Sequence, residues 1–533
     1  MNTSEQIQNY DIIFIGSGIG SLTAASLLAQ FKDKKILILE KHFQPGGFTH
    51  EFQRRQNKYS WDVGIHYIGD LAEGSFLKRI FDVITGNKLQ WQKMSEPFEK
   101  FVYPDKTFSV YGEPEKYISD LIKEFPEEEV AIRQYFKDVQ KVSIHIGKYT
   151  MLRNSAPSLD SISKLVSPDG SIRTLKDYYD THFKSDRLKG ILTSQWGNYG
   201  LPPHLASFAI HAQVVQHYMN GGYFPVGGSG NIFKFIEPII EEKGGKVLSS
   251  HEVEEVLIEQ NKAIGVKVKL LRGENRGSYT NFYAPVIVSD TGAYSSYLKL
   301  IPQSYPIAFR EDLRKFFNAQ TFTVSSVTAY IGLSDDPRKL GFNGENHWIY
   351  SSYEHDKVVT EKKNWYEEGG EPPVAYLSFP SLKNPEAKSH TADIITFMDY
   401  EVFARWKDLP WKKRGEEYES LKKIIADKLI QVVDTKYPGF KDMIEYVELS
   451  TPLSNEHFTS HVKGTIYGLP CVPERYQKEK TPWFEVKTPL EGFYLTGTDT
   501  SSPGVSGALM GGLSTANVLL GKDNIVKLIS KKA

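Results

Sequence analysis

The chain has 533 residues, and this length predicts more than one domain. Hydrophobic residues make up 40% and charged residues 24% of it, a globular balance that excludes a mainly disordered or collagen-like protein. Because 64 Lys and Arg face 65 Asp and Glu, the basic excess typical of nucleic-acid-binding proteins is missing, and we expect no nucleic-acid partner. The single cysteine, Cys471, excludes an internal disulfide and cysteine-rich metal centres, and we expect no metal site.

The first ten residues are polar and carry no basic segment followed by an apolar run, so no secretory signal is predicted. The longest apolar stretch, residues 12–28, is interrupted by three glycines and does not have the pattern of a membrane span. We expect a cytoplasmic protein, and leave open a peripheral contact with a membrane. Aromatic residues reach 13%, which fits either ordinary core packing or an apolar tunnel for a large flat substrate.

Residues 11–40 have the pattern of a strand, a glycine-rich turn, a helix and a second strand. The apolar run Ile12–Ile15 predicts a buried parallel strand. The next segment is Gly16-Ser17-Gly18-Ile19-Gly20-Ser21, which predicts a turn. Residues 22–31 combine small residues with leucines and predict a helix packed closely on a sheet. Residues 35–40 predict a second strand that ends in Glu40.

This turn has the features of a dinucleotide-binding loop. Gly16 permits the tight turn, Gly18 lets the backbone approach a pyrophosphate, and Ser21 is a small residue at the third position. The positive end of the following helix would face the phosphates. The carboxylate of Glu40 can accept both hydroxyls of an adenosine ribose and would repel a 2′-phosphate, so we expect no NADP in this pocket.

Two further glycine-rich segments favour a flavin over a nicotinamide dinucleotide. The pair Gly46-Gly47 follows Glu40 closely, where a chain passing beside a longer, permanently bound cofactor needs small residues. Near the C-terminus, a strand over 493–496 leads into Gly497-Thr498-Asp499 and then into a helix from Gly507 to Leu520. The N-terminus of that helix would lie where a reduced flavin concentrates negative charge.

The remaining pattern predicts two interleaved domains. Helices are predicted over 114–125, 127–142 and 414–433, and strands over 246–249, 253–259, 263–269 and 285–289. We predict a discontinuous dinucleotide-binding domain from residues 1–75, 219–300 and 481–533. Residues 76–218 and 301–480 are predicted to form a substrate-binding domain.

Together these segments resemble the FAD-binding signature of the phytoene-desaturase-like flavoproteins, a branch of the amine-oxidase-like fold. The loop Gly64-Ile65-His66-Tyr67-Ile68-Gly69 and residues 208–232 are similar to the retinol saturase branch of that family. The resemblance spans residues 11–521 and implies an α/β protein. Its Rossmann-like FAD-binding domain would be of the glutathione-reductase and amine-oxidase type, with an interleaved α+β substrate domain. The chain departs from the family at Val226, where the family pattern has an arginine.

The resemblance also implies the site residues. Those expected to bind FAD are Gly16, Ser17, Gly18, Gly20, Ser21, Glu40, Lys41, Gly46, Gly47, Phe48, Gly64, Ile65, Val253, Asp290, Gly497, Asp499, Gly504, Val505, Ser506 and Ala508. The expected catalytic acids are His66 and Tyr67, each weighed against a purely structural role. Residues expected near the substrate are His211, His217, Tyr223 and Phe224. His211 and His217 are six residues apart and do not share a helix face, which argues against a paired metal site.

The implied reaction is saturation of a C=C bond in a conjugated polyene lipid, as in a retinol 13,14-reductase, with hydride from flavin N5. Three alternatives stay open: a carotenoid or phytoene desaturase, a carotenoid cis–trans isomerase, and a non-enzymatic escort protein for prenylated partners that shares the fold. The expected partner is a lipophilic small molecule. NAD(P)H is left open as an external reductant because the chain has no second dinucleotide motif. The sequence predicts no particular oligomeric state.

Overall fold

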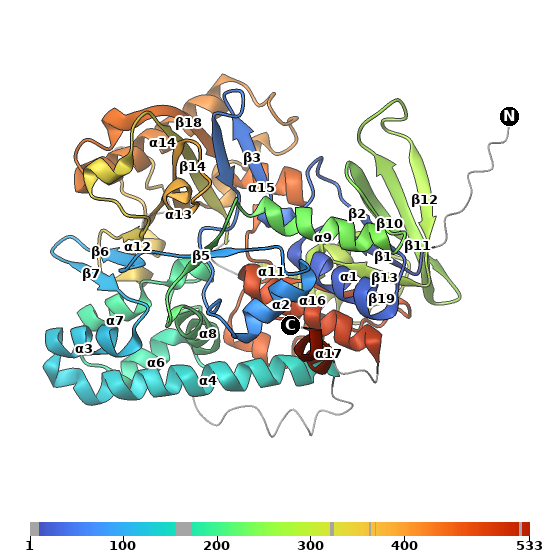
Figure 1. Cartoon of the computed structure of the whole chain (residues 1–533), viewed down its shortest axis with the longest axis horizontal. Coiled ribbons are helices and arrows are strands. Elements are labelled where there is room, and N and C mark those ends of the chain that lie inside the picture. The colour runs from blue at the N-terminus through green and yellow to red at the C-terminus, as the bar shows by residue number, and fades with distance from the viewer. Residues whose placement is uncertain are drawn as a thin grey trace.

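The computed structural model describes residues 10–155, 172–319, 324–361, 364–367, 369–521 and 525–532. The parts of the predicted domain ranges that fall in the gaps lie outside the described residues. Figure 1 shows a parallel sheet with its helices on one side of the molecule and a larger mixed sheet on the other. None of the described helices combines the length and the hydrophobicity that a membrane span requires.

A five-stranded parallel sheet in the order β19-β13-β1-β2-β9 lies at the centre of the first half. Its strands come from the beginning, middle and end of the chain. They are β1 (Ile12–Ile15), β2 (Ile36–Leu39), β9 (Lys246–Leu248), β13 (Val286–Ser289) and β19 (Phe493–Leu495). Every residue of β1 and β2 is buried, as expected for apolar runs covered on both faces. This sheet and its crossover helices confirm the predicted Rossmann-like fold.

Two helices pack unusually closely beside this sheet. Helix α1 (Ile19–Lys32) contacts α16 (Gly504–Leu520) because glycines line the approach. A Cβ atom on Gly512 would lie 2.3 Å from the backbone oxygen of Gly20, and a Cβ on Gly20 would lie 2.6 Å from the Cα of Gly497. The helices that surround this pair are α2 (Phe76–Ile84), α9 (Gly230–Glu242) and α17 (Ile525–Lys532).

An antiparallel sheet extends from the same half, at the right of Figure 1. Its strands are β10 (His251–Glu259), β11 (Lys262–Leu270) and β12 (Tyr279–Tyr283). The predicted strands over 253–259 and 263–269 are therefore confirmed. Residues of β10 contact β2, so the start of this sheet lies beside the end of the strand that carries Glu40.

The second half contains a seven-stranded sheet in the order β18-β14-β17-β16-β15-β6-β7. Its strands are β6 (Glu99–Val102), β7 (Thr107–Val110), β14 (Ser326–Leu333), β15 (Asn346–Ile349), β16 (Ala375–Ser378), β17 (His390–Phe397) and β18 (Ile444–Ser450). The parallel pair β6–β15 places Glu99 opposite Asn346 although the two are far apart in sequence. Helix α14 (Glu416–Lys436), close to its predicted position, packs on β16 and β18.

Two antiparallel strand pairs lie outside the larger sheets. Strands β3 (Glu51–Arg54) and β4 (Tyr59–Asp62) form an antiparallel pair. The buried rings of Tyr59 and Trp61 on β4 pack against Tyr330 of the seven-stranded sheet. Strand β5 (Trp91–Lys93) pairs with β8 (Tyr223–Pro225).

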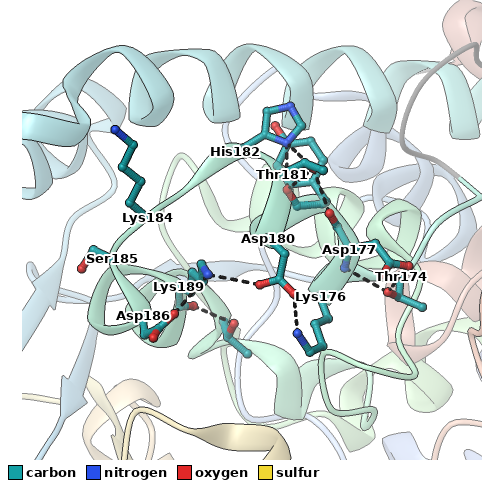
Figure 2. A network of polar contacts seen from close by, with 12 residues as sticks. Thr174, Lys176, Asp177, Asp180, Thr181, His182, Lys184, Ser185, Asp186 and Lys189 are labelled. Carbon is teal, nitrogen blue, oxygen red and sulfur yellow. Dashed lines mark hydrogen bonds and ion pairs between the residues drawn. The ribbon is translucent and has the colours of Figure 1, made fainter.

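A layer of helices covers the lower left of Figure 1. It consists of α3 (Pro114–Glu124), α4 (Glu129–Ser155), α6 (Leu175–His182), α7 (Asp186–Thr193) and α8 (Phe208–Tyr218). Helix α4 extends well beyond the predicted 127–142, because its buried positions continue through Ile146 and Tyr149. Figure 2 shows the surface ion pair between Asp180 of α6 and Lys189 of α7 that joins the two helices; Asp180 also contacts Lys176 within α6, and Lys189 also contacts Asp186 within α7.

Candidate dinucleotide and substrate site

A cavity of about 1130 Å³ lies between the two halves. Its wall includes the glycine turn after β1 and the end of β2 on one side, and residues of β14, β16 and β17 on the other. A volume above the usual range of roughly 300–1000 Å³ for a single small-molecule pocket indicates room for more than one ligand. The cavity is therefore large enough for a dinucleotide with a second molecule at its end.

The turn after β1 forms a cradle that only small residues allow. Gly16 has a φ of +90°, and Gly16, Ser17 and Gly18 line the cavity. A Cβ atom on Gly47, which also lines it, would lie 3.0 Å from the Cα of Gly18, so the two glycine segments nearly touch. The N-cap residue of α1, Gly18, supplies no side-chain hydrogen bond, and Ser21 N donates to Asp290 Oδ2 (3.0 Å), so the N–H groups of Ile19 and Gly20 are those that could meet an anion. This cradle fits a pyrophosphate.

Glu40 lies at the cavity wall where β2 ends. Its Oε2 accepts hydrogen bonds from Ser17 N (2.9 Å) and Ser17 Oγ (2.6 Å), and its Oε1 accepts from His42 N (2.7 Å). Burial raises the pKa of Glu40, and these three hydrogen bonds oppose the rise. The carboxylate is thus fixed, with lone pairs left that can accept ribose hydroxyls.

Other predicted residues of the adenosine end lie nearby. Lys41 lines the cavity, donates to Ser460 Oγ (2.7 Å) and forms an ion pair with Glu252 (2.9 Å). Val253, on β10, also contributes to the wall. The position of β10 beside the end of β2 accounts for this grouping.

Two buried carboxyl groups connect the chain segments beneath the cradle. Asp290 accepts a hydrogen bond from Ser21 N (3.0 Å), and burial raises its pKa to about 7. Asp499 accepts from Ala293 N (2.7 Å) and Leu469 N (3.0 Å). Asp290 and Asp499 both line the cavity. Within the described residues, their carboxyl groups accept hydrogen bonds mainly from backbone N–H groups.

The N-terminus of α16 opens on the same cavity. Gly504 has a φ of +79°, the N-cap Pro503 supplies no side-chain hydrogen bond, and Gly504, Val505, Ser506 and Ala508 line the wall. Uncapped N–H groups at a helix start carry partial positive charge. Phe48 and Gly64 complete this region, and a Cβ on Gly64 would lie 2.9 Å from the backbone oxygen of Phe48.

Five predicted cofactor residues do not line the cavity. Gly20 and Gly497 pack against each other behind it, and Ser21 is fully buried beside Asp290. Gly46 donates its N–H to Ser17 Oγ (2.9 Å), and Ile65 belongs to the apolar core. These residues shape the cradle from behind and do not form its surface.

His66 and Tyr67 both line the cavity. The side chain of His66 is 15% exposed, and its Nδ1 lies 3.4 Å from Oδ2 of the buried Asp393. Tyr67 donates its hydroxyl hydrogen to Oε1 of Glu99 and accepts from Asn198 Nδ2 (2.9 Å). Burial raises the pKa of Tyr67 far above its ordinary value, and the neighbouring Glu99 adds to the rise.

The predicted substrate residues divide into two groups. His217 lines the cavity; its Nε2 accepts a hydrogen bond from Gly69 N (2.8 Å), and burial lowers its pKa to about 4. His211 lies outside the wall, where the hydroxyls of three tyrosines, Tyr135, Tyr179 and Tyr199, contact its ring nitrogens.

Tyr223 and Phe224 are also absent from the wall, contrary to the expectation that they line it. Both lie on β8, which pairs with β5, and the ring of Phe224 is completely buried in the core around the parallel sheet. The short antiparallel pairing with residues 91–93 fixes the position of this segment.

The far wall comes from strands that the sequence did not single out. Its apolar and aromatic residues are Tyr330, Trp348, Val374, Tyr376, Ile395 and Phe397. Strand alternation brings them together, since β14, β17, β16 and β15 are neighbours in one sheet. Behind this wall lie buried polar residues: Glu99, Lys383 and Asp393. Asp393 is the one acidic residue of β17, whereas Glu99 is followed by Lys100 in β6 and Lys383 ends a short helix, so the sequence pattern did not indicate that all three are buried.

Comparison with known proteins agrees with this geometry. Residues 15–83 match a family model described as an NAD(P)-binding Rossmann-like domain. The chain is 32% identical to an all-trans-retinol 13,14-reductase of Danio rerio, over 97% of this chain and 87% of that protein. It is 30% identical to the human protein of the same name, over 96% and 86%. It is 25% identical to a chloroplastic prolycopene isomerase of an Oncidium hybrid, over 94% and 81%.

Solved structures share the fold at low sequence identity. An oxidoreductase from Methanosarcina mazei has a TM-score of 0.59 and 15% identity, covering 95% of this chain and 99% of that one. Cyclohexylamine oxidase from Brevibacterium oxydans has a TM-score of 0.58 and 13% identity, covering 98% and 99%.

The fold and the matches define an oxidoreductase with a Rossmann-like dinucleotide-binding domain and the architecture of the amine oxidases. Within that class, the chain belongs to the family of the all-trans-retinol 13,14-reductases, to which the prolycopene isomerases are also related. The predicted family resemblance is thereby confirmed.

Proposed function

We propose that this protein is an FAD-dependent reductase that saturates one C=C bond of a conjugated isoprenoid lipid, a retinoid being the first substrate to test. One observation carries this proposal: a single cavity joins the glycine cradle at Gly16–Gly18 to a slot walled by Trp348, Tyr376 and other apolar side chains. A polyene in that slot would lie directly at the end of a dinucleotide held in the cradle.

The residues of the cradle fit FAD in particular. Glu40 would hold the adenosine ribose, and the glycine turn at the start of α1 would hold the pyrophosphate. The uncapped start of α16 would lie at the pyrimidine edge of the isoalloxazine ring. When bound and reduced, FAD supplies a hydride to a carbon of a double bond.

The slot suits a long, largely apolar substrate. Its walls combine aromatic rings with Val374 and Ile395, which offer no hydrogen-bonding side chains. Tyr67 stacks on Tyr218 with ring centroids 4.2 Å apart and is held by Glu99, so its position is rigid. A rigid apolar slot orients a flat polyene and shields the developing charge from solvent.

The proton that completes saturation needs an acid at the wall. His66 has a partly exposed ring in the cavity, whereas the hydroxyl hydrogen of Tyr67 is directed to Glu99. His217 accepts a hydrogen bond at Nε2, so that nitrogen carries no proton to donate. We therefore assign the general acid to His66, and a structural role in the wall to Tyr67.

Cis–trans isomerisation of a carotenoid is the second candidate. It is supported by the prolycopene isomerase relatives and would use the same slot. The two reactions differ in the fate of the electrons, since saturation consumes a reductant and isomerisation does not. NAD(P)H is the external reductant to test first, although no cavity residue argues for it.

We also propose that the protein works in the cytoplasm and meets its lipid substrate at a membrane surface. One wall of the cavity comes from α4, through Ser143, Gly147, Thr150 and Met151. The exposed positions on the same helix include Lys137, Lys141, Ile144, Lys148 and Met151. A stripe of lysines and apolar residues at the cavity suits contact with an anionic lipid surface.

Product analysis tests the reaction. The purified protein should be yellow, with an absorption band near about 450 nm that disappears on reduction. After anaerobic reduction it is incubated with all-trans-retinol, its cis isomers and a panel of carotenoids. A product heavier by two hydrogens supports saturation, and unchanged mass with altered retention supports isomerisation. A colourless protein that takes up no FAD would contradict both and favour the escort alternative.

A further inference from the structure

A buried carboxyl group stands directly behind the candidate acid. Asp393 lies on β17, in the seven-stranded sheet, whereas His66 lies on the loop after β4. The two side chains meet across the junction of the halves, with Oδ2 of Asp393 3.4 Å from Nδ1 of His66. Nδ1 is shielded from solvent, so the exposed 15% of the imidazole belongs to its other atoms and faces the cavity that His66 lines.

The position of Asp393 demands a proton or a cation. Its side chain is completely buried, and within the described residues neither of its oxygens accepts a hydrogen bond. An ionised carboxylate without a partner costs several kcal/mol at such a site, by the order of magnitude known for buried ions. Burial raises the pKa of Asp393, and His66 and Lys383 oppose that rise.

Within the part of the chain that the structure describes, the other titratable groups around Asp393 do not form a hydrogen bond with its carboxyl group. Lys383, on α13 (Pro380–Lys383), donates to Asn346 Oδ1 (2.7 Å), Ser378 Oγ (2.6 Å) and the backbone oxygen of His66 (2.6 Å). Asp62, on β4, accepts from Ser229 N. The remaining titratable neighbours are the hydroxyls of Tyr330 on β14 and Tyr376 on β16.

We propose that Asp393 is the positioning residue of His66: it pairs with the Nδ1–H group and keeps the imidazole cationic, so that the other ring N–H, on the cavity side, can deliver its proton to the substrate. This inference rests on the proposed reductase function. His66 lines the cavity, and its 3.4 Å separation from Asp393 is typical of catalytic pairs whose hydrogen bond tightens only when a ligand is bound.

The proton step balances as follows. Reduced FAD, when bound, would supply a hydride that carries both electrons and forms a C–H bond at one olefinic carbon. An N–H bond of the His66 imidazolium breaks, and its proton forms the second C–H bond at the neighbouring carbon. The pair changes from a net charge of zero to minus one and takes a proton from water after the product leaves. Lys383 holds the His66 backbone and lies close enough to offset this negative charge.

Nitrogen NMR of the full-length protein, labelled with ¹⁵N only at histidine, tests the pair without any turnover. The signals of His66 are assigned by their loss in His66→Gln. In the wild type at neutral pH we expect a proton on Nδ1 and a cationic fraction. In Asp393→Asn we expect the ratio of cationic to neutral His66 to fall about tenfold or more, the scale of a lost carboxylate neighbour.

A matched control replaces another buried carboxyl. Glu345 is as buried as Asp393 and lies 3.5 Å from His347, and Glu345→Gln should leave the His66 signals unchanged. An unprotonated Nδ1 in the wild type across pH 6–8, or unchanged His66 protonation in Asp393→Asn, would overturn the proposal. The protonation state of His66 in the wild type tests the proposal even if the Asp393→Asn variant does not fold.

Single-turnover reduction of a polyene then separates this proposal from the proposed function. In Asp393→Asn with a normal FAD content, we expect product formation to slow by tenfold or more and to gain a steeper fall as the pH rises. A wild type that binds FAD but reduces no polyene would refute the proposed function and leave the NMR result standing. Equal rates and equal pH profiles in both proteins would refute the role of Asp393.

Discussion

The hydroxyl of Tyr67 donates its hydrogen to Glu99, a completely buried carboxyl group 32 residues further along the chain. Glu99 also accepts from Trp348 Nε1 (2.9 Å) and Gln195 Nε2 (2.7 Å). Three donors therefore fix one carboxylate behind the cavity wall, and they join β6 and β15 of the seven-stranded sheet to the loop that carries His66. The orientation of Tyr67 and Trp348 in the wall follows from Glu99.

Replacing Glu99 by Gln should destabilise the protein although the volume is kept. A glutamine offers one acceptor oxygen, and its NH₂ group would face donors where Glu99 now accepts from three. We expect a loss of about 2 kcal/mol or more, the range for buried hydrogen bonds to a charged group. The midpoint of urea unfolding, followed by tryptophan fluorescence, measures it. The exposed Glu274→Gln is the control, and equal midpoints for both variants would contradict this account.

The sequence was sufficient for the dinucleotide half because its signals are local. A buried apolar strand, a glycine turn and a helix follow one another within residues 12–32, and the structure has these elements at those positions. Glu99 and Asp393 could not be predicted in the same way. Glu99 is followed by Lys100 in β6 and Asp393 is the one acidic residue of β17, and the partner of each becomes apparent only when the order of the strands is known. The surroundings of His211 could not be predicted for the same reason, since its tyrosine partners come from other helices.

Two glycine-to-alanine changes should have opposite effects. A Cβ on Gly20 would lie 2.6 Å from the Cα of Gly497 and 2.7 Å from its backbone N, so α1 would have to move away from the C-terminal segment. Gly147, in the middle of α4, has no atom within 4 Å of the added Cβ among the described residues. We expect Gly20→Ala to lose several degrees in melting temperature. We expect Gly147→Ala to be stabilised by about 0.5–1 kcal/mol through helix propensity.

Differential scanning fluorimetry of both variants with and without added FAD makes the comparison. Gly147 lines the cavity, so Gly147→Ala also reports whether the α4 side tolerates a methyl group near the substrate. A stable Gly20→Ala protein would show that the close packing of α1 on the 497–512 region is not required.

Stability should fall in mild acid because of His211. Burial lowers the pKa of His211 to about 3, below the ordinary 6.5. The unfolded chain therefore binds a proton more readily than the folded one, and the stability held by neutral His211 is complete above pH 6.5. It is lost as the pH falls toward 3, with a loss of about 2 kcal/mol by pH 5.

The variant His211→Gln separates the contribution of His211 to the pH dependence of stability from that of the other groups. At pH 7.5 it should be less stable than the wild type, since three tyrosine hydroxyls lose their imidazole partner. Between pH 7 and pH 5, its free energy of unfolding should fall less steeply than that of the wild type. Urea titrations at several pH values give both curves. Parallel curves would show that protonation of His211 does not cause the loss of stability in acid. The candidates would then be His42, His217 and His355, whose pKa values burial lowers to about 4.

Glu40 should control the affinity for FAD. In the variant Glu40→Gln, the new NH₂ group cannot accept the hydrogen bond from His42 N, and the negative charge that would bind the ribose hydroxyls is gone. We expect the Kd for FAD to rise about tenfold or more, since a hydrogen bond to a charged group contributes roughly 1.5–3 kcal/mol. Titration of the apoprotein with FAD, followed by quenching of flavin fluorescence, measures this Kd.

Glu252→Gln is the matched control. Glu252 lines the same end of the cavity but is paired with Lys41, so its charge is already compensated and its loss should change the Kd little. If both variants bind FAD as the wild type does, the ribose is held elsewhere and the orientation of the dinucleotide in the cradle has to be reversed.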